Sequence, residues 1–210
     1  MDGAELDKQF FTRLLQHTNN FSGLTWLGYP VWQNLFDLWT TQEVIFEVKP
    51  SLLIECGSCL GGSAIYYANL FDLMGKGRVI SIDIEKQHNF THPRVEFLIG
   101  DSAGPEIVAT VRKAVEEAGG PIMVILDSDH SADHVEREFE AYCGFVTVGS
   151  YMLVQDGVID VLDIFAGGRP GPLEAIRRAL PRHPEFQVDM IKCNRFLITH
   201  HPAGWLKRVS

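Results

Sequence analysis

Short apolar segments alternate with amphipathic helical patterns from Ser51 almost to the end of the chain, and this alternation limits the possible folds most strongly. The apolar segments, rich in β-branched residues, span 51–57, 78–84, 95–101, 121–129 and 150–157. Helical patterns follow at 61–74, 106–118, 132–142 and 172–180. Near-continuous apolar strands separated by helices are typical of a mostly parallel sheet covered on both faces. The sequence therefore predicts an α/β fold.

The two ends of the chain depart from this alternation. After the last helix, FQVDM (186–190) and RFLITHH (195–201) follow with no room for a helix between them, which predicts an antiparallel hairpin. Before Ser51, aromatic residues gather ahead of a helical pattern at 37–48. We interpret residues 1–50 as an N-terminal helical extension over the ligand edge of the sheet, although a plain core helix fits equally well. Residues 51–210 then form the sheet domain.

Composition and charge exclude several classes of protein. The chain has 210 residues, of which 46% are hydrophobic, enough for one core. Its 18 basic and 27 acidic residues give a net charge of −9, which disfavours a nucleic-acid partner. No apolar stretch approaches the roughly 20 residues that span a bilayer, and the start MDGAELDKQFF is acidic, unlike a signal peptide. Four cysteines form no disulfide framework, so we expect a soluble cytoplasmic protein.

Glycines and acidic residues follow the predicted strands, at the edge where a doubly wound sheet binds ligands. The first strand ends at Glu55, and a glycine-rich turn follows it before the next helix. The second strand ends at Asp83, and a carboxylate there is the usual partner of ribose hydroxyls. An adenosine-bearing cofactor would therefore contact residues after the first four strands: Glu55, Gly57, Gly61, Gly62, Ser63, Asp83, Asp101, Ser102 and Asp127.

The position of Glu55 narrows the type of cofactor. It stands two residues before Gly57, where it would repel a pyrophosphate but attract an ammonium group. S-adenosylmethionine carries an ammonium group and no phosphate. No tyrosine has a lysine four residues later, which excludes the proton relay of the short-chain reductases. The alternative is a purely structural strand-to-helix turn, because the glycine spacing alone is a weak signal.

A second group of polar residues follows the fourth and fifth strands. Asp127 ends the fourth strand with His130 three residues later, and Gln155 and Asp156 end the fifth. Oxygen ligands at Asp127, Gln155 and Asp156 suit Mg²⁺, which could bind a substrate hydroxyl and lower its pKa. His130 would accept the proton, because histidine is the side chain best suited to accept a proton near neutral pH. In the alternative interpretation the acidic groups cap the next helix and His130 is an ordinary loop residue.

Other histidines and cysteines carry weaker signals. Cys56 and Cys59 have the C-x-x-C spacing of a redox pair or half of a zinc site, but they lie inside the glycine turn. We place His200 and His201 at a strand end on the surface. We expect the aromatic N-terminal segment and the loop from Phe165 to Pro172 to wall an acceptor pocket. The aromatic N-terminus would also suit a homo-oligomer.

Three blocks of sequence resemble one known family. They are DLWTTQEVIFEVKPSLLIECGSCLGGSAIYYANL, VILDSDHSADHVEREFEAYCGFVTVGSYMLVQDG and GWLKRV, within residues 26–210. They resemble the cephalosporin hydroxylase/rhamnosyl O-methyltransferase family of class I S-adenosylmethionine-dependent methyltransferases. The resemblance implies a Rossmann-like, seven-stranded sheet with an antiparallel last strand, and an O-methyltransferase acting on a hydroxyl of a sugar, glycolipid or secondary metabolite.

The resemblance also implies roles for individual residues. Asp127 and Asp156 would hold Mg²⁺ and His130 would be the base, while Gln155 stands where related enzymes have glutamate. Two other functions stay open. A non-haem iron oxygenase is one of them, and its iron would need two histidines and a carboxylate close together. The only H-x-E triplets begin at His134 and His183, in a predicted helix and a proline-rich turn, which are poor places to converge on one metal. A catalytically silent domain that only binds cofactor is the third possibility, since Gln155 could have cost the site its metal.

Overall fold

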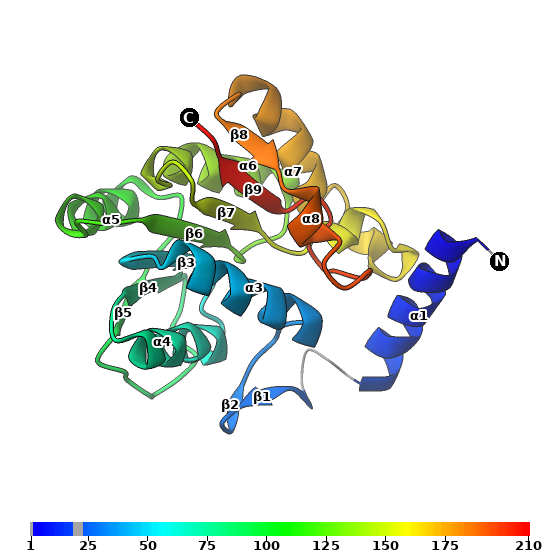
Figure 1. The fold of residues 1–210 in the computed structure, drawn as a ribbon, viewed down its shortest axis with the longest axis horizontal. Helices are drawn as coiled ribbons and strands as arrows, with labels where there is room; N and C mark the ends of the chain where they lie inside the picture. The colour runs from blue at the N-terminus through cyan, green and yellow to red at the C-terminus, as the bar shows by residue number, and fades with distance from the viewer. Residues whose placement is uncertain (1, 19–22) are drawn as a thin grey trace.

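A computed structural model describes residues 2–18 and 23–210. A central sheet of seven strands has the order β5-β4-β3-β6-β7-β9-β8 (Figure 1). In chain order its strands are β3 (Leu52–Cys56), β4 (Arg78–Asp83), β5 (Val95–Ile99), β6 (Ile122–Leu126), β7 (Tyr151–Val154), β8 (Phe186–Val188) and β9 (Trp205–Arg208). The first five lie within the apolar segments predicted from the sequence. The predicted α/β class is confirmed.

The pairing of the strands explains which residues meet at the ligand edge. β3 pairs in parallel with both β4 and β6, as do β4 with β5 and β6 with β7, so the carboxyl ends of these five strands share one edge of the sheet. β9 runs antiparallel between β7 and β8, which confirms the antiparallel last strand. Every residue of β3, β6 and β7 is buried, as expected of central strands covered on both faces.

Helices cover both faces of the sheet (Figure 1). On one face lie α5 (Pro105–Glu117), α6 (Ala132–Tyr142) and α7 (Pro172–Ala179), packed on one apolar cluster. On the other face lie α3 (Leu35–Val48) and α4 (Gly62–Met74), packed on a second cluster. None of the helices in the described ranges, 2–18 and 23–210, is long and apolar enough to cross a membrane.

The N-terminal segment combines both interpretations offered by the sequence. Val44 and Ile45 of α3 are fully buried, so this helix belongs to the core. The loop before it reaches the ligand edge, where Gln33 donates a hydrogen bond to Asp127. Ahead of that loop stand α1 (Gly3–Thr18) and a small hairpin of β1 (Thr25–Trp26) and β2 (Tyr29–Pro30). A domain boundary after residue 50 stays a prediction.

The predicted C-terminal hairpin is right in its first strand and wrong in its second. β8 pairs with β9, whereas residues 195–201 form no strand. A short helix, α8 (Met190–Cys193), follows β8, with Asp189 capping its first N–H groups. The backbone N–H of His200 donates to the side chain of Asp37, and that of His201 to the hydroxyl of Thr199. These N–H groups are therefore not free to pair in a sheet.

Short 3₁₀ helices complete the chain. They are η1 (Cys143–Phe145), η2 (Gly157–Asp160), η3 (Asp163–Gly168) and η4 (Leu180–Arg182). η2 and η3 lie between β7 and α7, on the ligand side of the sheet. Phe11 and Leu15 of α1 pack against Val158, Leu162 and Ile198, so the N-terminal helix lies beside this segment (Figure 1).

Candidate active site

Two glycines at either end of the turn after β3 lie where no side chain fits. Gly57 has φ +101°, and a Cβ there would lie 1.9 Å from the carbonyl oxygen of Asp127. A Cβ on Gly62 would lie 1.9 Å from the carbonyl oxygen of Pro30. Gly57 lets the turn approach the end of β6, and Gly62 lets the start of α4 approach the N-terminal hairpin. The turn therefore leads directly into α4 with its backbone open to the ligand edge.

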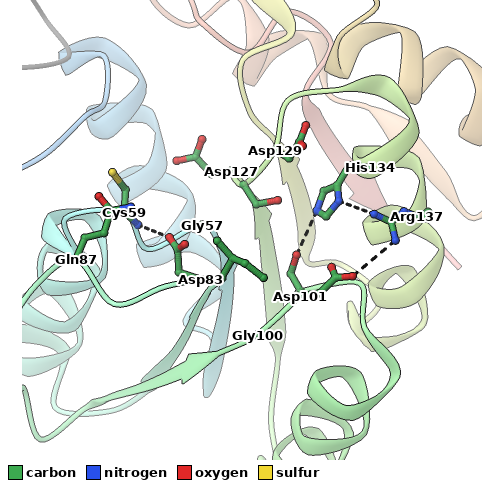
Figure 2. A pocket seen from close by; sticks show the side chains of 13 residues that line it. Gly57, Cys59, Asp83, Gln87, Gly100, Asp101, Asp127, Asp129, His134 and Arg137 are labelled. Atoms are coloured by element: carbon green, nitrogen blue, oxygen red, sulfur yellow. Dashed lines mark hydrogen bonds and ion pairs between the residues drawn. The ribbon is translucent and has the colours of Figure 1, made fainter.

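A cavity of about 510 Å³ lies beyond the ends of β3, β4, β5 and β6. Asp83 and Cys59 lie on one side of it and Asp101, His134 and Arg137 on the other, with Asp127 between them (Figure 2). The backbone N–H of Cys59 donates to Asp83 at 2.7 Å and fixes this carboxylate at the end of β4. Of the predicted cofactor residues, those lining the cavity are Gly57, Asp83, Asp101, Ser102 and Asp127.

The other predicted cofactor residues lie outside this cavity. Gly61, Gly62 and Ser63 line a crevice of about 20 Å³ below Trp32. Glu55 is fully buried under the turn, where Ser81 donates a hydrogen bond to it. Burial raises the pKa of Glu55 to about 7, although hydrogen bonds from Ser63 and Ser81 act in the opposite direction. The proposed contact of Glu55 with an ammonium group stays a prediction.

A buried glutamate that sequence reasoning missed holds the α6 side of the same cavity. Glu138 accepts hydrogen bonds from Ser102, after β5, and from Ser128, after β6. His134, one helical turn before it, lies 3.3 Å from its Oε1 atom, and this contact raises the pKa of His134. Arg137 contacts the other ring nitrogen of His134 at 2.8 Å. Glu138 thus ties two strand ends to α6.

A second cavity, of about 410 Å³, adjoins the first. Its walls come from Trp32 before α3, His130 after β6, Asp156 after β7, and Val158, Ile159 and Phe165 of the 3₁₀ segment. The two cavities share three lining residues, which are Cys59, Asp127 and Ser128. Trp32 and Phe165, from the two segments expected to wall an acceptor pocket, both line this cavity, while its use by an acceptor stays a prediction. Asp127 stands where the two cavities meet.

Asp127, His130 and Asp156 come together as the sequence predicts. One ligand atom from each lies within 4.8 Å of the other two, an arrangement that could hold a metal ion. Among residues 2–18 and 23–210, this is the one group of three or more histidine, cysteine, aspartate or glutamate side chains with such spacing. His130 Nε2 lies 3.1 Å from Asp156 Oδ2. Cys56 and Cys59 are free thiols and do not join such a group.

The two aspartates have opposite electrostatic environments. Burial, together with the negative charge of Asp156, raises the pKa of Asp127 well above its usual range. Burial also acts on Asp156, but the hydrogen bond from His200 and the nearby imidazoles hold its pKa below the usual range. The pair therefore carries one negative charge more easily than two. A cation between them would remove this restriction.

Two amides surround the Asp127 carboxylate. Gln33 Nε2 donates to its Oδ2 at 2.7 Å. Gln155 is also buried, and with its amide nitrogen turned toward Asp127 it donates to both carboxylate oxygens at 3.2 and 3.3 Å. In that orientation Gln155 also donates to Oε1 of Gln33 at 2.8 Å. Gln155 as a metal ligand stays a prediction, whereas its contact with Asp127 is a feature of the fold.

His200 and His201 lie beside Asp156, not on the surface as we expected. Each is 1% exposed. His200 Nδ1 lies 3.3 Å from Asp156 Oδ1, and His201 Nδ1 accepts the backbone N–H of Asp156 at 3.1 Å. Asp37 of α3 holds this segment from the other side. No local pattern could reveal these contacts, because Asp37 and His200 are 163 positions apart.

Comparison with known proteins adds an independent line of evidence. A sequence profile for "Rhamnosyl O-methyltransferase/CmcI" matches residues 18–209. The rhamnosyl O-methyltransferase of Mycobacterium tuberculosis (strain ATCC 25618 / H37Rv) is 34% identical over 192 residues, covering 88% of this chain and 78% of that protein. The Mycobacterium leprae (strain TN) protein of the same name is 33% identical over 191 residues, covering 88% and 82%.

Solved structures share the fold at lower sequence identity. A structure of CmcI with Mg and SAM has a TM-score of 0.67 and 20% identity, covering 91% of this chain and 78% of that one. The apo structure of CalS11, a TDP-rhamnose 3'-O-methyltransferase of calicheamicin biosynthesis, has a TM-score of 0.56 and 18% identity, covering 99% and 96%. At these identities the likeness supports the arrangement of sheet and helices.

Proposed function

This chain belongs to the rhamnosyl O-methyltransferase/CmcI family, and on that premise we propose that it transfers the methyl group of S-adenosylmethionine to a hydroxyl oxygen with the help of a divalent cation. The enzyme class follows from the profile match and from the named relatives, which align with most of the chain. The site residues and the acceptor are our own assignments.

The junction of the two cavities is the observation that carries the mechanism. Methyl transfer requires the donor and the acceptor to meet in line, with water excluded from between them. A cavity of about 510 Å³ beside one of about 410 Å³, with Asp127 and Ser128 in the walls of both, offers room for the two substrates face to face. We place the methyl group and the attacking oxygen at this junction.

The first cavity fits S-adenosylmethionine. The Asp83 carboxylate faces it and would accept hydrogen bonds from both ribose hydroxyls (Figure 2). Asp101 and Ser102 lie on the opposite wall of this cavity, where the adenine ring would reach. The methionine part would lie over Gly57, toward the junction with the second cavity. Glu55 below the turn would then attract the ammonium group.

The group formed by Asp127, His130 and Asp156 fits a divalent cation such as Mg²⁺. Asp127 is partly buried and close to Asp156, so the ionised pair is costly unless a positive charge joins it. When bound, a divalent cation lowers the pKa of a coordinated hydroxyl and holds its oxygen in place. The carboxylates of Asp127 and Asp156 would be its ligands from this chain. Gln33 and Gln155 orient Asp127 for that role.

His130 is placed to accept the proton of the acceptor hydroxyl. With Nε2–H donated to Asp156, its Nδ1 atom is left to take the proton as the oxygen attacks the methyl carbon. Asp156 then stabilises the imidazolium that forms. The bond between sulfur and the methyl group breaks with its electron pair going to sulfur, which yields S-adenosylhomocysteine and the methyl ether. His130 lines the second cavity, as this role requires.

The acceptor we propose is a sugar hydroxyl on a glycolipid or a secondary metabolite. The named relatives are rhamnosyl O-methyltransferases, which favours a deoxysugar. The second cavity is lined by the apolar side chains of Trp32 and Phe165 as well as by the polar side chains of His130 and Asp156. A sugar ring has both characters, with apolar C–H faces and hydroxyls at its edge.

The test is production of S-adenosylhomocysteine with a panel of rhamnosylated acceptors, measured in Mg²⁺ and after removal of the ion by a chelator. We expect product only with an acceptor, and a rate that falls after chelation and returns with added Mg²⁺. Binding of S-adenosylmethionine without product for any acceptor would favour the catalytically silent domain. Consumption of oxygen after loading with iron would favour the oxygenase.

Partners and location complete the proposal. We infer a small-molecule acceptor and no nucleic-acid partner, supported by the net charge of −9. Exposed apolar side chains at Leu35, Trp39 and Phe46 of α3 support a homo-oligomer. The four free cysteines support a reducing compartment such as the cytoplasm.

A further inference from the structure

Asp37 is a buried carboxylate on α3 that lines neither cavity. Its side chain is 4% exposed, and both of its oxygens accept hydrogen bonds. Thr199 Oγ1 donates to Oδ1 at 2.6 Å, and the backbone N–H of His200 donates to Oδ2 at 2.8 Å. Thr199 in turn accepts the backbone N–H of His201 at 2.9 Å. Asp37 therefore fixes the turn formed by residues 199–201.

That turn holds Asp156 at two points. His201 Nδ1 accepts the backbone N–H of Asp156 at 3.1 Å, and His200 Nδ1 lies 3.3 Å from its Oδ1 atom. Asp156 has φ +56°, a left-handed backbone conformation that few residues with a side chain adopt. Such a conformation persists only where the surroundings hold it. The turn supplies this constraint on the backbone and the side chain together.

We propose that Asp37 is a positioning residue of the cation site, acting through the turn 199–201 to set the backbone and the carboxylate direction of Asp156. This inference rests on the proposed function, since it assumes that Asp156 holds a cation. By this inference the first turn of α3 helps to shape the cation site, although Asp37 lines neither cavity. Groups that orient metal ligands in this way typically change metal affinity by roughly 10- to 100-fold when removed.

A second link between the same helix and the same C-terminal segment provides the control. Glu43 accepts two hydrogen bonds from Arg195, at 2.9 and 3.0 Å, on the exposed side of α3. It joins α3, through Arg195, to the chain ahead of the turn. Glu43→Gln therefore loosens the attachment of α3 while leaving the contacts of Asp156 in place. Any effect specific to Asp37 should be absent in this variant.

The experiment measures Mn²⁺ affinity by calorimetry in the full chain, without cofactor or acceptor. We expect Asp37→Asn to weaken Mn²⁺ binding by roughly 10- to 100-fold and to reduce the Mn²⁺-induced rise in melting temperature. S-adenosylmethionine affinity should stay within about twofold, because Asp37 lies outside the cofactor cavity. Glu43→Gln should bind Mn²⁺ as the native chain does. Thr199→Val, which removes one hydroxyl, replaces Asp37→Asn if that variant fails to fold.

Each outcome decides the matter. A folded Asp37→Asn or Thr199→Val chain with native Mn²⁺ affinity overturns the inference and leaves the proposed function intact. Equal losses in Glu43→Gln and Asp37→Asn also overturn it, because loosening α3 would then be the cause. A native chain that binds no Mn²⁺ overturns the cation in the proposed function and this inference with it.

Discussion

The two cavities that meet at Asp127 are built in different ways. We call the first of them the cofactor cavity and the second the acceptor cavity, after the ligands that we propose for them. Most walls of the cofactor cavity come from residues at the ends of β3, β4, β5 and β6, each within a few positions of its strand. The acceptor cavity shares residues after β3 and β6, and the rest of its walls come from the loop before α3, the end of β7 and the 3₁₀ segment. One of its polar groups, Asp156, is held by His200 and His201. One cavity follows from the sheet itself, whereas the other requires segments far apart in the chain.

The difference suggests that the two cavities control different properties, namely cofactor binding and catalysis. A parallel sheet brings its strand ends together in any sequence that folds this way, so a common cofactor can bind there. The second cavity depends on loops, which change shape more easily than strands. We expect changes in the cofactor cavity to affect binding of S-adenosylmethionine and changes in the acceptor cavity to affect catalysis. The variants below test this separation.

The largest effect is expected on kcat, and it should separate two histidines that line different cavities. His130→Ala should lower kcat by roughly 10²- to 10⁴-fold with cofactor affinity nearly unchanged, because the attacking hydroxyl loses its base. His134→Ala, in the cofactor cavity, should mainly weaken S-adenosylmethionine binding. Single-turnover rates and calorimetry measure the two effects. If His130→Ala keeps its rate and the acidic limb of its pH profile, another group activates the acceptor.

A smaller effect is expected at the ribose position. Asp83→Ala should weaken S-adenosylmethionine binding by roughly 10- to 100-fold, because the ribose hydroxyls lose a charged acceptor. The rate at saturating cofactor should change little. Asp101→Asn, an exposed residue on the opposite wall of the same cavity, is the matched control and should have a smaller effect. Equal losses in the two variants would mean that general charge in the cavity matters, not a ribose contact.

The positions of the residues that line the cofactor cavity could be predicted from the sequence because each follows directly after a strand, whereas their contacts with a cofactor stay predictions. Apolar runs identify buried strands, and the residues after them must lie at the ligand edge, so Asp83, Asp101 and Asp127 could be assigned by position. Parallel pairing of β6 and β7 also placed Asp156 near Asp127. The sheet, its antiparallel last strand and the flanking helices followed from the same alternation, together with the family resemblance.

The remaining contacts depend on tertiary packing that no short pattern encodes. His200 and His201 follow β-branched and apolar residues, so residues 195–201 matched a strand pattern, yet their backbone bonds to Asp37 and Thr199. Gln33 bonds to Asp127, and Glu138 bonds to Ser128, between elements that only the folded chain brings together. Each is a polar residue in a loop or on a helix, where solvent exposure is the usual expectation. Their burial is visible only in the folded chain.

A third test changes the charge beside Asp127. In Gln155→Glu a second carboxylate would stand about 3.2 Å from Asp127, which should tighten Mg²⁺ about tenfold because the added charge favours a cation. Without metal the same variant should be less stable than the native chain near neutral pH. Gln155→Leu, which adds no charge, should not tighten Mg²⁺. Unchanged Mg²⁺ affinity in Gln155→Glu would mean that residue 155 does not contact the cation and only orients Asp127.

The smallest expected effect concerns Glu55 and the pH dependence of cofactor binding. Its pKa of about 7 means that it is half ionised at pH 7 and about one-tenth ionised at pH 6. If the ionised form pairs with the ammonium group, affinity is present above this pKa and falls as the pH drops through it. We expect S-adenosylmethionine to bind about fivefold more weakly at pH 6 than at pH 7.

Two variants assign that pH dependence to one side of the cavity. Glu55→Gln imitates the protonated carboxyl group, so it should bind weakly at both pH values and lose the slope. His134→Gln removes the titratable imidazole on the opposite wall, whose pKa is raised by Glu138, and should keep the slope. Calorimetry at pH 6.0, 6.5 and 7.0 compares the three proteins. If the pH dependence of the affinity persists in Glu55→Gln and disappears in His134→Gln, then His134 causes it. Glu55 would in that case be a buried carboxyl group with a structural role only.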